Sequence, residues 1–398
     1  MNILIISNFF TPTIHIASFR IEAFAKYFSK AGHTVTVVTE GGCNKIEMWN
    51  NCSVHYLRDS MLLTQMNFKD SDSFLMHKIK SAFNLVFNFI FLDKKVFWKK
   101  RAEKYIERLF NLNPYDVILT SYGPHAPLQI ALHLKRKKYI FKWIIDMRDE
   151  MSKNLFFNSY TRYRLKKIER QYLDSSDLVL SVSDPILDGF RENCSHDNFL
   201  EVKNGYDFDE IHTNIKQPQF TLGYVGSFYG AIKPDNLFIA LSQLKKEGRI
   251  PENFKFKIIG NRKPLIIPAS IEENVFQYDR VPHIKAVEML SQCDVLLIIH
   301  PTGRKGVYTG KLFDYLASNR TILALADPND VIAPILEETN SGFIVDNADI
   351  EGIKEQIIKC YALYNNNSML ERDWSNIKKY TRENQVTILL NFMKENWE

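Results

Sequence analysis

Two glycine-rich loops in the second half of the chain could hold the phosphates of a nucleotide. The first reads GYVGSFYG over residues 223–230, with Gly226 and Ser227 near its centre and Lys233 shortly beyond. Glycine lets backbone amides approach a phosphate closely, and a nearby lysine can neutralise its charge. A glycine-rich turn after an apolar run is common in α/β proteins, so this loop alone is weak support for phosphate binding.

The second loop strengthens this interpretation. It covers residues 301–311 (PTGRKGVYTGK) and leads into a predicted helix that starts at Leu312. The amides of Thr309 and Gly310 and the dipole of the helix favour a diphosphate, and Lys311 at the helix start can reach it. Asp314 is placed in the first helical turn, where it could accept hydrogen bonds from a ribose. Simple complementarity to the helix dipole explains this carboxylate equally well.

The pattern of apolar runs predicts the strands and helices that position these loops. Short apolar runs alternate with stretches of helix length, which is typical of βαβ units on parallel sheets. The expected strands are 3–7, 35–39, 117–120, 143–146, 178–183, 220–225, 256–259, 275–278, 295–300, 321–325 and 343–345. The first helix is expected to run from about Ile16 to Ala31 and to stop at Gly32.

The alternation stops at about residue 207 and restarts at Phe220, which predicts two domains. We expect an α/β protein with two Rossmann-like domains facing across a cleft, one covering 1–207 and the other 208–375. In such sheets the ligands lie at the loops after the strands.

Composition narrows the functional class. The 398 residues carry a formal net charge of +5 without a basic tail, which is weak support for nucleic acid as a partner. The five cysteines are scattered and contain no Cys-x-x-Cys pair, which argues against a disulfide framework or a zinc site. With no expected secretion signal, these features predict a cytoplasmic protein.

Residues 60–112 differ from the rest and are expected to form a helical insertion into the first domain. Apolar positions between Phe83 and Phe91 lie beside lysines between Lys94 and Lys100. Such a face over about 74–101 could bind the inner face of the cell membrane peripherally, or it could pack in the core; both remain open. The most apolar stretch, 82–92, is shorter than the roughly 20 residues that span a bilayer.

With these residues in view, the chain resembles the nucleotide-sugar glycosyltransferases of family 4, which have the GT-B fold. The segments that carry the resemblance are 7–12 (SNFFTP) with Arg20, 31–37 (AGHTVTV), 146–149 (DMRD), 203–207 (KNGYD), 223–227 (GYVGS), 258–260 (IIG), 293–297 (CDVLL) and 310–317 (GKLFDYLA). Each is weak alone, but their order and spacing extend over most of the chain.

The resemblance implies where the substrates bind. The donor, a UDP- or GDP-linked sugar, would lie in the second domain, with its diphosphate at Gly226, Thr309 and Gly310, its ribose at Asp314 and its base near Arg262. On the first domain, His125 in SYGPH would contact the transferred sugar, as a neutral imidazole can both donate and accept. A loop histidine that only caps a helix is the plainer alternative.

The resemblance also implies the activity. The chain is expected to be a retaining, metal-independent hexosyltransferase that needs no cofactor besides its nucleotide-sugar co-substrate, and Lys233 and Lys311 would stabilise the leaving diphosphate. The acceptor would be a glycan or lipid-linked glycan in cell-surface polysaccharide synthesis. As in relatives, residues 376–398 would form a helix that crosses back to the first domain.

The sequence departs from the family pattern in three places, and the first two, which replace charged residues, keep a second function open. Ser227 stands where an arginine is usual, Gly306 stands where a glutamate is usual, and residues 15–17 (HIA) replace a glycine pair. A noncatalytic nucleotide-sugar-binding partner protein is therefore the alternative. A nicotinamide oxidoreductase is excluded, because the loop after the first strand lacks the required glycines.

Overall fold

The computed structural model describes residues 1–13, 16–59, 73, 75–81, 83, 93, 95–154, 157–208, 216–261, 263–300 and 305–397. The chain divides into two compact units. Unit 1 comprises Met1–Lys203 and Val386–Glu398, and unit 2 comprises Asn204–Gln385. Within the described ranges, every helix is too short or too polar to cross a bilayer.

Unit 1 is built on an eight-stranded sheet with the order β3-β4-β2-β1-β5-β6-β7-β8. All neighbouring strands are parallel except β3, which pairs antiparallel with β4 at the sheet edge. The strands are β1 (Asn2–Ile6), β2 (Thr34–Gly41), β3 (Lys45–Trp49), β4 (Cys52–Arg58), β5 (Val117–Ser121), β6 (Lys142–Asp146), β7 (Leu178–Ser181) and β8 (Phe199–Glu201).

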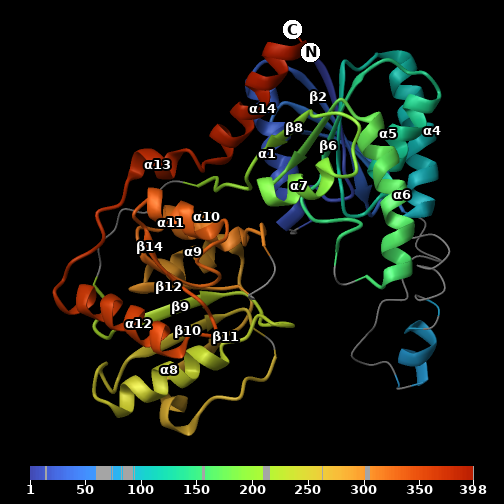
Figure 1. Cartoon of the computed structure of the whole chain (residues 1–398). Coiled ribbons are helices and arrows are strands. Elements are labelled where there is room, and N and C mark those ends of the chain that lie inside the picture. The colour runs from blue at the N-terminus through green and yellow to red at the C-terminus, as the bar shows by residue number, and fades with distance from the viewer. Residues whose placement is uncertain are drawn as a thin grey trace. The chain divides into compact units, whose positions relative to one another are not determined.

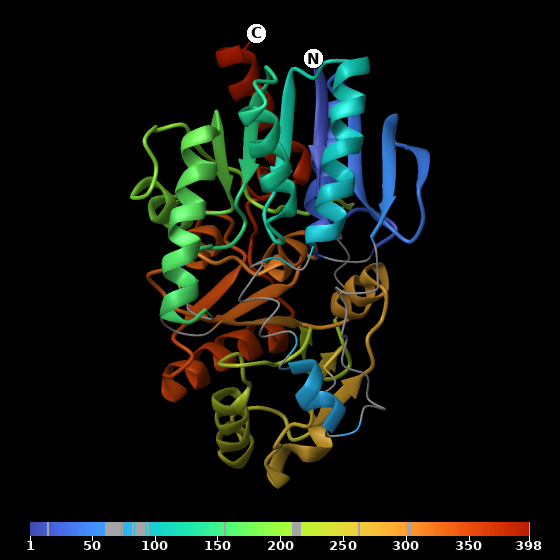
Figure 2. The same cartoon turned by 90° about the vertical axis from the view of Figure 1, so that its right-hand side faces the viewer.

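Helices cover both faces of this sheet, and Figure 1 shows α4, α5 and α6 on one side and α1 and α14 on the other. Figure 2 looks onto the α4–α6 layer. The helices of unit 1 are α1 (Ile16–Lys30), α4 (Val96–Leu112), α5 (Ala126–Arg136), α6 (Ser159–Ser175), α7 (Asp184–Arg191) and α14 (Arg382–Trp397). The last part of α14 belongs to this core, where Val386, Leu389 and Met393 are buried with strands β1 and β2.

The central strands consist almost wholly of aliphatic residues because helices bury both of their faces. Residues 3–6 of β1 are completely buried, with Ile3 between Val35 of β2 and Val117 of β5. The helix α1 ends as expected, since Gly32 adopts a φ of 89°, the left-handed conformation that terminates a helix.

Unit 2 is a fully parallel six-stranded sheet with the order β11-β10-β9-β12-β13-β14, the doubly wound Rossmann order. Its strands are β9 (Thr221–Val225), β10 (Lys255–Ile259), β11 (Val275–Tyr278), β12 (Val295–Ile299), β13 (Thr321–Leu325) and β14 (Gly342–Val345). Its helices are α8 (Asp235–Lys246), the 3-10 helix η1 (Ala269–Asn274), α9 (His283–Ser291), α10 (Gly310–Ala317), α11 (Ile332–Glu338), α12 (Ile350–Asn365) and α13 (Trp374–Lys378). One core lies under α8 and α12, and the other lies under α9, α10 and α11.

The structure confirms the predicted α/β class and the expected strands, and it adds three strands that the apolar pattern did not reveal. Strand β3 lies at the edge with its residues largely exposed, β4 carries a buried His55, and β8 has only three residues. In the segment expected to be an insertion, α4 packs on α5 and buries Trp98, Ile106 and Phe110. Most of the apolar stripe expected at the membrane lies outside the described residues.

Candidate functional site

The first candidate site in unit 2 lies where the strand order reverses, between β9 and β12, which is where open α/β sheets bind ligands. Strand β9 ends at Val225, and Gly226 follows with a φ of 114°, a conformation that side-chain-bearing residues rarely adopt. Its amide donates to the Ile259 carbonyl over 2.8 Å. This bond holds the glycine turn against the end of β10.

Lys311 is the cation that the fold brings to this turn. A Cβ atom on Gly226 would lie only 3.0 Å from both Cε and Nζ of Lys311, so the glycine leaves room for the lysine side chain. The Lys311 ammonium donates to the Tyr224 hydroxyl over 2.8 Å and lies 3.9 Å from the centre of the same ring. Lys311 and Tyr224, which are 87 positions apart in the chain, thus meet near the end of β9.

The charge of Lys311 is not balanced by a carboxylate. Among the described residues its ammonium contacts Tyr224, whose own pKa is raised by burial, and it forms no ion pair. Burial lowers the pKa of Lys311 to about 7. A half-buried cation that lacks an anionic partner is stabilised when an anion binds, because the ligand then supplies the missing charge.

The start of α10 lies directly beside this lysine. Thr309 precedes the helix in an extended conformation, and its side chain does not cap the helix. The first amides of a helix have no acceptor within the helix, so those of α10 can serve an anionic ligand. Lys311 and these amides together offer both charge and hydrogen-bond donors to a phosphate.

The position of Asp314 corrects one expectation. The helix begins at Gly310 rather than Leu312, so Asp314 is its fifth residue and lies beyond the first turn, where it complements the helix dipole less. Its Oδ2 lies 2.8 Å from Nε2 of His283, and this hydrogen bond raises the pKa of the histidine. A ribose would have to compete with His283 or use the other carboxylate oxygen.

The other residues that were predicted to bind the sugar donor do not gather around Lys311. Ser227 is exposed and donates from its hydroxyl to the Gly260 carbonyl over 3.1 Å. Lys233 is also exposed, in the turn before α8, and makes no hydrogen bond or ion pair with any described residue. Arg262 lies outside the described residues.

The second candidate site lies in unit 1 and contains His125, which immediately precedes α5. The imidazole is 7% exposed, and its ring meets that of Tyr122 edge-on with 5.2 Å between the centres. It does not cap the helix with its side chain. Burial lowers the pKa of His125 to about 4, so the ring is neutral at pH 7. A neutral ring can donate one hydrogen bond to a sugar hydroxyl and accept another.

Asp146 ends the neighbouring strand β6 and serves a structural purpose. It is fully buried and pairs with Arg20, whose Nη2 lies 2.8 Å from Oδ1, and it accepts a hydrogen bond from the Ser121 hydroxyl over 3.0 Å. Arg20 also donates to the Val202 carbonyl over 2.7 Å. Arg148 lies further from this carboxylate, with 3.9 Å between its Nε and Oδ2 of Asp146, and it donates to the Tyr122 carbonyl over 2.8 Å, which fixes the loop that carries His125.

Sequence reasoning did not identify Tyr224 or Asp93. Tyr224 sits inside an apolar strand, and only its contact with Lys311 distinguishes it from a core residue. Asp93 lies in a region read as an insertion, yet it is buried and its carboxylate takes hydrogen bonds from backbone amides of Lys95 and Ala126 at the start of α5. Burial raises its pKa to about 6.

Of three comparisons with known proteins, the one with solved structures identifies the fold. A comparison with protein-family models gives no match, and neither does one with the sequences of curated proteins. The chain is similar to the solved structure of a sucrose-phosphate synthase from Thermosynechococcus elongatus, with a TM-score of 0.70 and 13% identity, covering 99% of this chain and 98% of that one.

Two further solved structures are similar over nearly the whole chain. One is a UDP-forming trehalose-phosphate synthase from Burkholderia xenovorans in complex with glucose-6-phosphate, with a TM-score of 0.66, 12% identity and 99% of each chain covered. The other is a lipopolysaccharide outer core galactosyltransferase, with a TM-score of 0.57, 11% identity and 99% of each chain covered. The chain therefore has the two-domain α/β fold of GT-B glycosyltransferases. Membership of family 4 in particular stays a prediction.

Proposed function

We propose that the protein is a retaining glycosyltransferase that moves a sugar from a UDP- or GDP-linked donor to a glycan or lipid-linked glycan. In this proposal unit 2 binds the donor, with its diphosphate at Lys311, Gly226 and the first amides of α10. Unit 1 binds the acceptor near His125. As the diphosphate leaves, the lysine and the amides stabilise its charge without proton transfer.

The observation that carries the proposal is the state of Lys311. Its ammonium is half-buried against a glycine turn, faces a tyrosine rather than a carboxylate, and has its pKa lowered to about 7 by burial. A structural lysine would be expected to have a carboxylate partner or to reach solvent. A lysine held this way at the switch point of a Rossmann sheet suits the binding of a phosphate.

The acceptor class draws its support from similar proteins and from unit 1. One protein of similar structure is a lipopolysaccharide outer core galactosyltransferase, which favours a cell-surface glycan as the acceptor, and another is a UDP-forming synthase solved in complex with glucose-6-phosphate. The neutral imidazole of His125 suits contact with sugar hydroxyls rather than with an anion. Retention of configuration, independence of metal ions, a cytoplasmic location and peripheral contact at the membrane face belong to the proposal as well.

The direct test is isothermal titration calorimetry with UDP, GDP, ADP and CMP, each free and linked to a sugar. Wild type is compared with Lys311→Met, with Asp314→Ala, and with Lys246→Met as a matched control, because Lys246 is an exposed lysine of the same unit on α8. We expect one nucleotide to bind selectively, Lys311→Met to weaken it at least tenfold, and the control to leave it unchanged.

Two other outcomes would change the conclusion. If no nucleotide binds, the proposed transferase mechanism is wrong. If a nucleotide-sugar binds but is neither hydrolysed nor transferred to any offered glycan, the protein is instead a noncatalytic nucleotide-sugar-binding partner. The departures at Ser227 and Gly306 motivate that alternative, and Gly306 is tied through its amide to the Asp330 carboxylate over 2.8 Å.

A further inference from the structure

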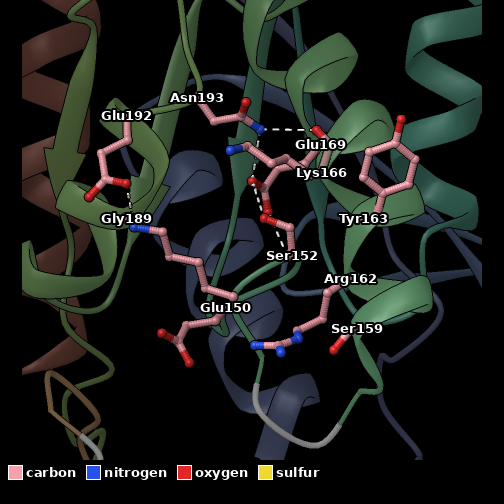
Figure 3. A pocket seen from close by; sticks show the side chains of 11 residues that line it. Glu150, Ser152, Ser159, Arg162, Tyr163, Lys166, Glu169, Gly189, Glu192 and Asn193 are labelled. Atoms are coloured by element: carbon pink, nitrogen blue, oxygen red, sulfur yellow. Dashed lines mark hydrogen bonds and ion pairs between the residues drawn. The ribbon is translucent and has the colours of Figure 1, made fainter.

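Unit 1 contains a polar cavity of ≈ 580 Å³ between α6, α7 and the segment that follows β6. Figure 3 shows side chains of α6 on one side of it, and Gly189 of α7 with Glu192 and Asn193 of the following turn on the other. The segment after β6 contributes Glu150, Ser152 and Lys153 to the lining. The volume lies within the roughly 300–1,000 Å³ of small-molecule sites. It is suited to an organic ligand rather than to a single ion.

The charges that line the cavity are balanced. Three cationic side chains and three carboxylates line it, namely Lys153, Arg162, Lys166, Glu150, Glu169 and Glu192. Lys153 is already paired with Glu192, with 2.7 Å between Nζ and Oε2. Because a phosphate site needs an excess of positive charge, this lining favours a neutral ligand.

A buried carboxylate forms the floor of the cavity. Glu169 is 1% exposed and accepts hydrogen bonds from the amide and hydroxyl of Ser152 over 2.8 and 2.7 Å and from the Asn193 side chain over 3.0 Å. These bonds fix the positions of a carboxylate, a hydroxyl and an amide group. Nearby, Nε of Arg162 is buried without a hydrogen-bond partner in the described part of the chain. The lining thus offers both acceptors and donors at fixed positions.

An aromatic ring lies at the cavity wall. Tyr163 is one of the lining residues, and its side chain is 77% exposed although it is large and partly apolar. An open aromatic face beside fixed polar groups fits a ligand with apolar C–H faces and a rim of hydroxyls. Pyranose rings have this combination, whereas phosphates and peptide strands do not.

The cavity lies in the same unit as the candidate site at His125 and close to the loop that carries it. Its first lining residue, Glu150, follows Arg148 by two positions, and Arg148 holds the Tyr122 carbonyl. The Glu169 carboxylate is near enough to contribute to the raised pKa of Tyr122, whose ring contacts that of His125. Both sites lie at the carboxyl ends of the strands of the same sheet.

From these observations we propose that the cavity between α6 and α7 is a glycan subsite. It holds a neutral sugar unit of an oligosaccharide acceptor while another unit of the same acceptor reaches His125. Tyr163 stacks on one sugar face, and Glu169, Ser152 and Asn193 hydrogen-bond its hydroxyls. This inference rests on the proposed function, because it names the acceptor as an oligosaccharide longer than one residue.

The fold offers two variants that change the cavity and two matched controls. Tyr163→Ala removes the aromatic face, and Tyr160→Ala removes a tyrosine of the same helix that does not line the cavity. A Cβ on Gly189 would lie 3.4 Å from Cδ of Lys153, an ordinary contact, so Gly189→Ala fits. Gly189→Trp would place an indole in the cavity.

The experiment is saturation-transfer-difference NMR on the full chain with maltotriose, cellotriose and chitotriose as probes, and with inorganic phosphate and glucose 6-phosphate as competitors. The nucleotide identified by calorimetry is titrated into every variant. We expect at least one trisaccharide to bind. Tyr163→Ala and Gly189→Trp should weaken it at least tenfold, whereas Tyr160→Ala and Gly189→Ala should not, and all four variants should bind the nucleotide as wild type does.

The failures of the two proposals can be told apart. If wild type binds the nucleotide but none of the trisaccharides, or if trisaccharide binding survives in both cavity variants, the glycan subsite is refuted and the donor site stands. Displacement of the trisaccharide by inorganic phosphate would show an anion site and would also refute it. If a trisaccharide binds in the cavity and no nucleotide binds, the subsite stands and the transferase proposal falls.

Discussion

Raising the pH from 7 to 9 should weaken binding of the nucleoside diphosphate about 50-fold, because the free protein must first protonate Lys311. Burial lowers the pKa of this lysine to about 7, and its ammonium contacts Tyr224 rather than a carboxylate. A bound diphosphate favours the protonated form and raises the pKa again. Binding is therefore coupled to proton uptake, and the affinity falls as the pH rises above the pKa of the free lysine.

The magnitude follows from the protonated fraction. With a pKa of about 7, half of the Lys311 side chains are protonated at pH 7 and about 1% at pH 9. The ratio of about 50 corresponds to about 2.3 kcal/mol of binding free energy. The terminal phosphate loses its last proton near pH 6, so the ligand itself contributes little to the change above pH 7.

Calorimetry in buffers of different ionisation enthalpy measures both the affinity and the proton uptake. Thermal shifts are a poor substitute, because an unfolded lysine binds more protons than Lys311 between pH 7 and about 10.5, so the stability of the free protein itself rises with pH. The hydrogen bond with Asp314 raises the pKa of His283, so this histidine is a second group whose protonation is coupled to the site. The variant His283→Gln separates its contribution.

Two substitutions of Lys311 test whether protonation of this lysine causes the pH dependence of nucleotide binding. Lys311→Arg keeps a permanent charge and should remove the pH dependence, whereas Lys311→Met should bind weakly with a flat profile. An affinity in wild type that is constant from pH 7 to 9, with no proton uptake, would refute the assignment of Lys311 as the phosphate-binding cation with a lowered pKa.

Three further predictions concern other residues of the two sites. Gly226→Ala should weaken nucleotide binding at least tenfold, because its φ of 114° is strained for alanine and the new methyl lies 3.0 Å from the Lys311 ammonium. Gly230→Ala also introduces alanine at a positive φ, 56°, but no atom lies within 4 Å of the new methyl, so it should change nucleotide affinity little in the same titration and isolates the effect of the contact with Lys311. His125→Ala should lower the turnover of an active donor–acceptor pair roughly 10²-fold in steady-state kinetics while nucleotide affinity stays the same, and an unchanged turnover would exclude a part in the reaction. Because the pKa of His125 is about 4, its contribution should be constant above about pH 5 and lost below pH 4. Arg20→Met should remove the closer of the two ion pairs of the buried Asp146, leaving only Arg148 at 3.9 Å, and should cost about 3 kcal/mol in urea unfolding. Arg170→Met, which breaks an exposed ion pair with Asp174, is the control and should change the stability little.

The fold was largely predictable from the sequence because parallel strands covered on both faces must be continuous apolar runs. The strands β1, β5, β12 and β13 are five-residue segments dominated by aliphatic side chains, and each was expected close to its observed position. Edge strands need not be continuous apolar runs, because helices do not bury both of their faces. Strand β3 turns Ile46 and Met48 toward solvent, so its composition resembles that of a loop.

The candidate donor site was predictable in its parts but not in its geometry. Glycine at 226, lysine at 311 and the helix start at 310 are visible as residue types in loops that follow apolar runs. Which of the nearby lysines meets the glycine depends on how α10 packs on β9. The fold brings Lys311 against Gly226 and Tyr224 and leaves Lys233 exposed.

The sequence by itself determined the α/β class, the two-domain organisation that we expected and the loops where ligands would bind, because apolar periodicity and glycine placement are local properties. Only the tertiary structure decided how each charge is used. Asp314 is held by His283, Asp146 by Arg20, and Lys311 by no carboxylate among the described residues. Ion pairing and burial depend on residues far apart in the chain. Ion pairing and burial in turn set the pKa values, and they decide which charge is left for a ligand, on which the proposed chemistry rests.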